Sequence, residues 1–227
     1  MSSSFAEVRA RVVELLIVSA ERLNVSPIVK YSALSLFADR LCRSLSDPAR
    51  GSGADIDHWL LRPLTESSLQ LFALISLWIS CKMDNSRPLS VKRLKSLGDN
   101  MIKDQHFTTR DYIEAVSGFE IGVLNTLFAH LENLYLQFIG IAKMGEMVKF
   151  EACTSIMDLL YEKEIKPMRH SDPRILAASI LAIPKQMCEF PLLPWVTFRG
   201  CFNEDDVLKL VGDILKLVLC PSNMKPF

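Results

Sequence analysis

Apolar residues recur every three to four positions along most of the chain, which is the spacing of amphipathic helices. The first such segment covers about residues 4–23. A second follows Ser26 and Pro27, a pair typical of a helix start, and reaches Leu41. No strand-like alternation of any length competes with this pattern. The chain is therefore predicted to be all-α.

Two segments, residues 66–83 and 175–187, are apolar on nearly every side. A helix without a polar face is one that other helices surround. Two amphipathic helices precede each segment and a capped helix follows it, beginning at Thr108 or Asn203. The two segments also share four identical residues at one constant offset: Ala73 and Ala177, Leu77 and Leu181, Ile79 and Ile183, Met83 and Met187. The economical interpretation is a duplicated five-helix unit, although four identities between leucine-rich helices also arise by chance.

Composition narrows the class of protein. The chain has 227 residues, of which 49% are hydrophobic, and this excludes a disordered chain. Twenty-six basic and 26 acidic side chains cancel, so the basic excess of a dedicated nucleic-acid binder is missing. The six cysteines form no CxxC pair, and no secretory signal begins the sequence. The longest apolar run, residues 71–79, is too short to span a membrane. We expect a reduced, intracellular protein.

Catalytic motifs are absent from the sequence. No phosphate-binding GxxxxGK[ST] or GxGxxG loop occurs, and neither does HExxH or GxSxG. The four histidines lie far apart, without the spacing of metal ligands. The sequence therefore predicts a non-enzymatic protein with no metal, cofactor or small-molecule ligand.

Two charged residues stand in apolar surroundings. Lys82 lies at the end of the apolar segment 66–83, and Glu120 lies within residues 108–127, which are predicted to form one helix. Taken alone, each fits an ordinary exposed side chain, and a lysine is favoured at a helix C-terminus.

Three stretches around these residues resemble the cyclin box. Phe37–Leu41 resembles the end of the second box helix, Lys82–Pro88 the lysine-to-proline step, and Phe119–Leu127 the glutamate-bearing fifth helix. The resemblance covers about residues 7–129, and residues 155–219 resemble the weaker second cyclin fold. The chain is most similar to the short J-type cyclins of plants.

The resemblance implies two five-helix cyclin folds in tandem, at residues 1–129 and 130–227. It also implies a non-catalytic regulatory subunit, present in the nucleus and the cytoplasm, that binds and activates a cyclin-dependent serine/threonine protein kinase as a heterodimer. In that family the residues matching Lys82 and Glu120 face the kinase. The apolar residues around them match Ile79, Met83, Leu124 and Phe128.

The first predicted helix departs from the family pattern. It lacks the Met-Arg-Ala-Ile-Leu segment and the nearby tryptophan that form a substrate-docking groove in many cyclins. Substrate docking by that route is therefore not expected. Arg9 or Arg11 is expected to form a structural ion pair with Asp39 that ties the first two helices together, and we favour Arg9.

Two alternatives remain open. Tandem cyclin folds also occur in general transcription factors that bind DNA, and residues 82–110 hold seven basic and three acidic side chains. The sequence lacks a zinc ribbon, which argues against a general transcription factor, so no nucleic-acid partner is expected. The other alternative is a scaffold that binds something other than a kinase.

Overall fold

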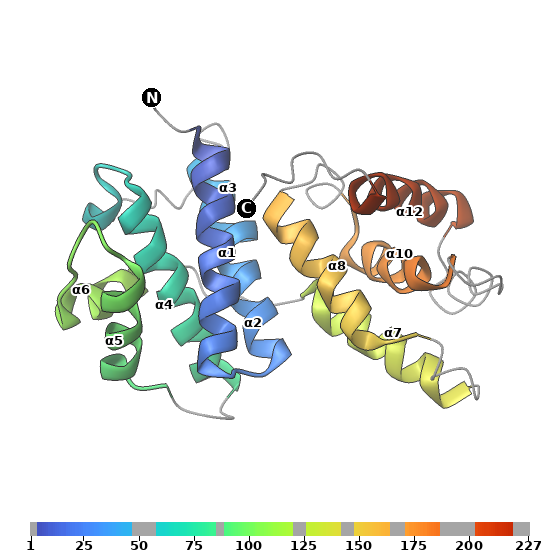
Figure 1. Ribbon diagram of the computed structural model, residues 1–227, viewed down its shortest axis with the longest axis horizontal. Helices are drawn as coiled ribbons and strands as arrows, with labels where there is room; N and C mark the ends of the chain where they lie inside the picture. The colour runs from blue at the N-terminus through green and yellow to red at the C-terminus, as the bar shows by residue number, and fades with distance from the viewer. Residues whose placement is uncertain are drawn as a thin grey trace. The chain divides into compact units, whose positions relative to one another are not determined.

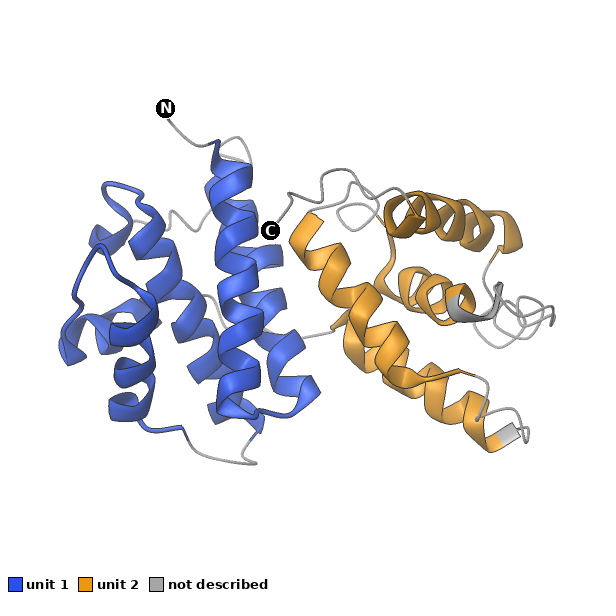
Figure 2. Ribbon diagram, viewed as in Figure 1, with its two compact units in different colours: residues 1–124 blue, residues 125–227 orange. Residues whose placement is uncertain are grey.

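The structure is a computed structural model that describes residues 4–46, 58–84, 89–119, 126–141, 148–163, 171–186 and 203–219. These ranges contain helices and no strand, so the predicted all-α class is confirmed (Figure 1). The chain divides into two compact units, residues 1–124 and 125–227 (Figure 2). The boundary between the units falls after residue 124, five residues before the boundary predicted after residue 129.

The first unit begins with two helical segments joined by a tight turn. Helix α1 (Phe5–Leu23) starts at Ser4, whose hydroxyl accepts a hydrogen bond from the Glu7 amide. It ends at Asn24, whose left-handed backbone (φ 50°) turns the chain toward α2 (Pro27–Leu34). The predicted second helix extends beyond residue 41, because a π-helical segment and α3 follow α2 directly: Ser35–Leu41 and Cys42–Ser46.

Helix α4 (Glu66–Asp84) forms the core of the first unit. It packs against α1 and α2, and also against α5 (Val91–Met101) (Figure 1). Its central residues from Leu69 to Leu77 are buried on every side, apart from the half-buried Gln70. The position of α4 follows from its composition, because a helix that is apolar all round is stable only when other helices surround it.

The helix predicted over residues 108–127 is shorter than expected. Helix α6 (Thr109–Glu114) continues as a 3-10 turn to Gly118, and Phe119 is extended (φ −112°, ψ 127°). At Gly118 the backbone passes so close to Phe72 that an added Cβ would lie 2.5 Å from Cε1 of its ring. The Phe119 ring packs on the same Phe72 ring, with centroids 5.6 Å apart. Packing on α4 thus ends the helix before residue 119.

The second unit contains four helices in its described residues: α7 (Leu127–Ile141), α8 (Phe150–Lys163), α10 (Pro173–Gln186) and α12 (Glu204–Leu219). Helix α10 contacts each of the other three. Its residues from Leu176 to Ile183 are buried. Each of the two apolar segments of the sequence is therefore the central helix of its own unit, as the duplication predicts.

Candidate functional site

The C-terminal end of α4 combines a cation with an exposed apolar side chain. Lys82 is exposed in the last turn, where a positive charge is favoured by the helix dipole. Met83, the next residue, exposes 46% of its surface. Ile79, one turn earlier, exposes only 5% and belongs to the core. Of the predicted site residues on α4, Lys82 and Met83 are thus the two that a partner can contact directly.

Lys82 is held by an aromatic ring that the sequence analysis did not single out. The Lys82 ammonium lies 5.1 Å from the centre of the Trp78 ring, within the range of a cation–π interaction. The Trp78 indole N–H donates a hydrogen bond of 2.8 Å to the carbonyl of Leu89. The i, i+4 spacing of an aromatic residue and a lysine on one helix is the sequence signal that points to this pair.

The end of α4 is also connected to the start of α2. The Ser26 hydroxyl donates a hydrogen bond of 3.5 Å to a carboxylate oxygen of Asp84.

Cys81, near the end of α4, is a buried thiol. Its pKa is raised mainly by burial and then by the nearby charge of Asp84. Cys81 is therefore protonated at neutral pH and acts as a packing residue rather than a nucleophile.

Two of the predicted site residues, Glu120 and Leu124, lie outside the described residues, so their predicted roles remain predictions. Phe128 belongs to α7 in the second unit. Phe128 exposes 1% of its surface, and its ring packs edge-on against that of Phe150, with centroids 5.8 Å apart. In this conformation Phe128 is a core residue of its own unit.

The charged residues of α1 have different environments. Arg9 is buried, with 5% of its surface exposed, whereas Arg11 is exposed. Arg11 forms a two-pronged ion pair with Glu66 at the start of α4, with N–O distances of 3.0 and 2.6 Å. This pair ties α1 to α4. The expected pair between Arg9 and Asp39 stays a prediction.

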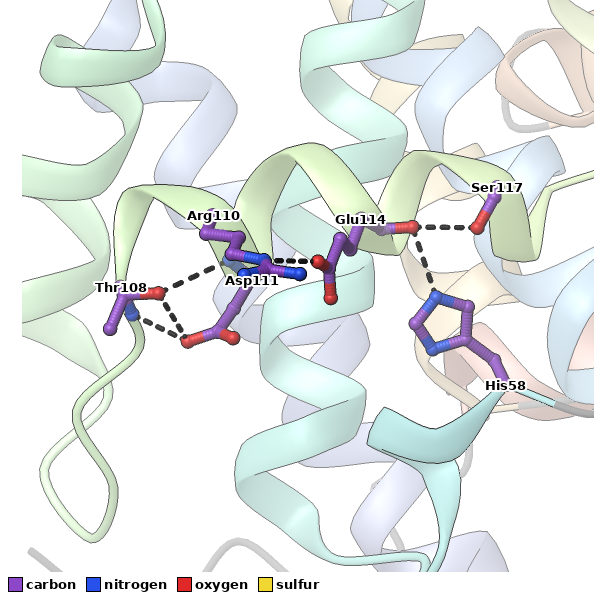
Figure 3. A network of polar contacts seen from close by, with 6 residues as sticks. All are labelled: His58, Thr108, Arg110, Asp111, Glu114 and Ser117. Carbon is purple, nitrogen blue, oxygen red and sulfur yellow. Dashed lines mark hydrogen bonds and ion pairs between the residues drawn. The ribbon is translucent and has the colours of Figure 1, made fainter.

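A second polar cluster joins the 3-10 turn η3 (Trp59–Leu61) to α6 (Figure 3). His58 is buried, and its Nδ1 accepts a hydrogen bond of 3.2 Å from the Leu60 amide. Its Nε2 is therefore the protonated nitrogen, and it donates to the carbonyl of Glu114 at 3.0 Å. The Glu114 carboxylate pairs with Arg110. Both ring nitrogens of the buried His58 are thus occupied by backbone groups, and this histidine has a structural role in joining η3 to α6.

The same cluster contains the predicted start of α6. The Thr108 hydroxyl accepts a hydrogen bond from the Asp111 amide, and the Asp111 carboxylate accepts one from the Thr108 amide (Figure 3). These two bonds form a capping box, so the capped helix start that the sequence predicts at Thr108 is confirmed.

Among the described residues, no group of three or more histidine, cysteine or acidic side chains is placed to hold a metal ion. No helix in the described ranges has the length and apolar character needed to cross a membrane.

Known proteins resemble the chain in sequence and in fold. It is 49% identical over 231 residues to Cyclin-J18 of Arabidopsis thaliana, covering 96% of this chain and 98% of the relative. It is 45% identical over 234 residues to Cyclin-J18-like of Oryza sativa subsp. japonica, covering 96% and 89%. No protein-family model matches. Among solved structures, a viral cyclin from herpesvirus saimiri shares the fold with a TM-score of 0.67 at 14% identity, covering 96% and 87% of the two chains.

Proposed function

Because the chain belongs to the cyclin family, we propose that it is a regulatory subunit that binds and activates a cyclin-dependent serine/threonine protein kinase. The observation that carries this proposal is the exposed pair Lys82 and Met83 at the end of the central helix α4. A lysine supplies three hydrogen-bond donors, and a neighbouring methionine supplies adaptable apolar area. Together they suit the carbonyl groups and apolar side chains of a docked helix.

The proposed mechanism changes a conformational equilibrium of the kinase. An active kinase requires its regulatory helix to lie inward, so that a glutamate of that helix pairs with the catalytic lysine. A partner that binds only the inward state shifts the population toward it. Reversing a ratio of 1:99 requires about 5.5 kcal/mol of differential affinity. An interface of roughly 1,200–2,000 Å² is large enough to supply this energy. The chain itself performs no chemistry in this scheme.

Glu120 is the second residue proposed to face the kinase. An ionised glutamate only accepts hydrogen bonds, so beside a lysine it complements amide donors of the same docked segment. Truncating either residue leaves a group of the kinase buried and unpaired, at a cost of about 2–5 kcal/mol.

The proposal is tested by co-purification with a kinase assay. The tagged chain is expressed in plant cells and recovered, and the bound material is assayed for kinase identity and for phosphorylation of histone. We expect kinase activity with the wild-type chain, and strongly reduced activity with Lys82→Ala and with Glu120→Ala. Lys92→Ala, which removes an exposed lysine of α5, is the matched control and should retain activity. Undiminished kinase recovery by both site variants removes the site assignment.

DNA binding is the alternative function that is most easily tested by experiment. Helix α5 exposes Lys92 and Arg93, but Lys95 forms an ion pair with Asp99 at 2.6 Å. Retention on duplex DNA across a salt series separates the classes, since DNA binding weakens steeply with salt. We expect no salt-dependent retention.

We propose further that the protein resides in the nucleus and the cytoplasm, where a cell-cycle kinase acts. Imaging of a fluorescent fusion expressed at native level tests this, and confinement to a secretory or organellar compartment would contradict it.

A further inference from the structure

Trp78 makes two interactions from one ring. Its indole N–H donates to the Leu89 carbonyl at 2.8 Å, and its face lies 5.1 Å from the Lys82 ammonium. Leu89 is buried and directly precedes Ser90, the residue that caps α5. The hydrogen bond therefore fixes the plane of the indole relative to the start of α5.

A fixed indole restricts Lys82. Residues four apart lie on the same face of a helix, so the lysine stem runs along the side of α4 that carries Trp78. A lysine on a helix surface otherwise samples many rotamers, and that freedom is lost when the side chain docks. Within the described part of the chain Lys82 makes no ion pair or hydrogen bond, and the aromatic ring is its partner.

We propose that Trp78 is a positioning residue that pre-orients Lys82 for the kinase, an inference that rests on the proposed function of Lys82. The ring occupies one side of the Lys82 ammonium, which leaves the N–H groups on its other side available to a partner. Part of the ordering that binding requires is then present in the free chain, and pre-organisation of this kind strengthens binding.

The expected effect is modest because the lysine is exposed. A cation–π interaction at an exposed site corresponds to about a two- to fivefold change in an equilibrium constant. Replacing Trp78 by leucine should weaken kinase binding by about that factor, far less than the removal of Lys82 itself. The effect of Trp78 should also vanish when Lys82 is already absent, since it acts through Lys82.

Two measurements test the inference. In the first, NMR of the chain labelled at lysine Cε follows the Lys82 Hε resonance, assigned by its loss in Lys82→Arg. The indole ring current should displace this resonance from that of the exposed Lys92, and Trp78→Leu should remove the displacement. In the second, the affinities of wild type, Trp78→Leu, Lys82→Met and the double variant are measured against a panel of purified plant cyclin-dependent kinases. Their thermal midpoints confirm that each variant folds.

The outcomes are separable. A displaced Lys82 resonance, with a Trp78→Leu effect that disappears in the Lys82→Met background, supports the inference. A wild-type Lys82 resonance that coincides with Lys92, or equal losses from Trp78→Leu in both backgrounds, overturns it. If Trp78→Leu does not fold, Trp78→Phe must show smaller changes in the same direction, and unchanged shift and affinity there overturn the inference. A wild-type chain that binds no kinase of the panel refutes the proposed function, while the NMR result still decides the positioning of Lys82.

Discussion

Gly98 on α5 offers a sharp test of how the first unit is packed. A Cβ added there would lie 1.8 Å from the hydroxyl oxygen of Tyr112, and 3.2 Å from Cδ1 of Leu74. Tyr112 is buried on α6, with 1% of its surface exposed, so its ring has little room to retreat. Gly98→Ala is therefore expected to force the two helices apart.

The sign of the effect distinguishes packing from helix propensity. On an open helix surface, glycine to alanine stabilises by about 0.8–1.0 kcal/mol. Overpacking a well-filled core costs about 1–3 kcal/mol. The difference between the two is a net loss of up to about 2 kcal/mol for Gly98→Ala. In a Tyr112→Phe background the offending oxygen is gone and the closest remaining ring atom lies 3.1 Å away. There the same substitution should be neutral or stabilising.

Urea denaturation followed by circular dichroism and tryptophan fluorescence measures these free energies. Gly212→Ala on α12 is the matched control, because no atom of the described residues lies within 4 Å of its added Cβ. The control should stabilise by about 0.5–1 kcal/mol. If Gly98→Ala stabilises the wild-type background as Gly212→Ala stabilises α12, then α5 and α6 do not pack as described and the reasoning is refuted.

Three further predictions use other described contacts. Among the residues that the structure describes, the buried hydroxyl of Ser80 has no hydrogen-bond partner. Ser80→Ala should therefore raise the unfolding free energy by about 1 kcal/mol, and a lower urea midpoint would contradict this. The hydrogen bond from Arg11 lowers the pKa of Glu66, so their pair stabilises at neutral pH and loses its contribution as pH falls through the folded pKa. Arg11→Gln should therefore flatten stability against pH in the acid range, whereas an unchanged acid profile would refute the pair. Burial raises the pKa of Cys153 to about 12, so an alkylating reagent should modify this thiol only when the protein unfolds. Mass spectrometry maps the modified cysteines, and rapid modification of Cys153 in the native protein would show that α8 is not packed as described.

The sequence pattern was sufficient to locate the central helices. Residues 66–83 carry no polar face, so burial on all sides was the expected arrangement, and the central part of α4, residues 69–77, has it apart from the half-buried Gln70. The helix start at Thr108 was also predicted correctly, because a capping box depends only on residues three apart in the sequence. Lys82 was also placed correctly in the last turn of its helix.

Features set by distant contacts escaped the sequence analysis. The helix after Thr108 stops at Gly118, where the backbone meets Phe72 of another helix. A single glycine within a helical pattern is a weak stop signal, and the sequence does not reveal the contact with Phe72. The role of Trp78 depends on a carbonyl eleven residues away. Phe128 was assigned to the binding surface by its match to a family motif, yet the apolar character that suits a surface also suits the core where it lies.

Titration of a purified plant cyclin-dependent kinase with the chain, with histone phosphorylation as the readout, tests the central claim most directly. The account predicts a saturable rise in kinase activity. It also predicts that Lys82→Ala moves the half-maximal concentration upward by about 30-fold or more, the equivalent of at least about 2 kcal/mol, whereas Lys92→Ala does not. An identical half-maximal concentration for wild type and Lys82→Ala would contradict the account. So would a failure to activate any of the plant cyclin-dependent kinases tested, at any concentration.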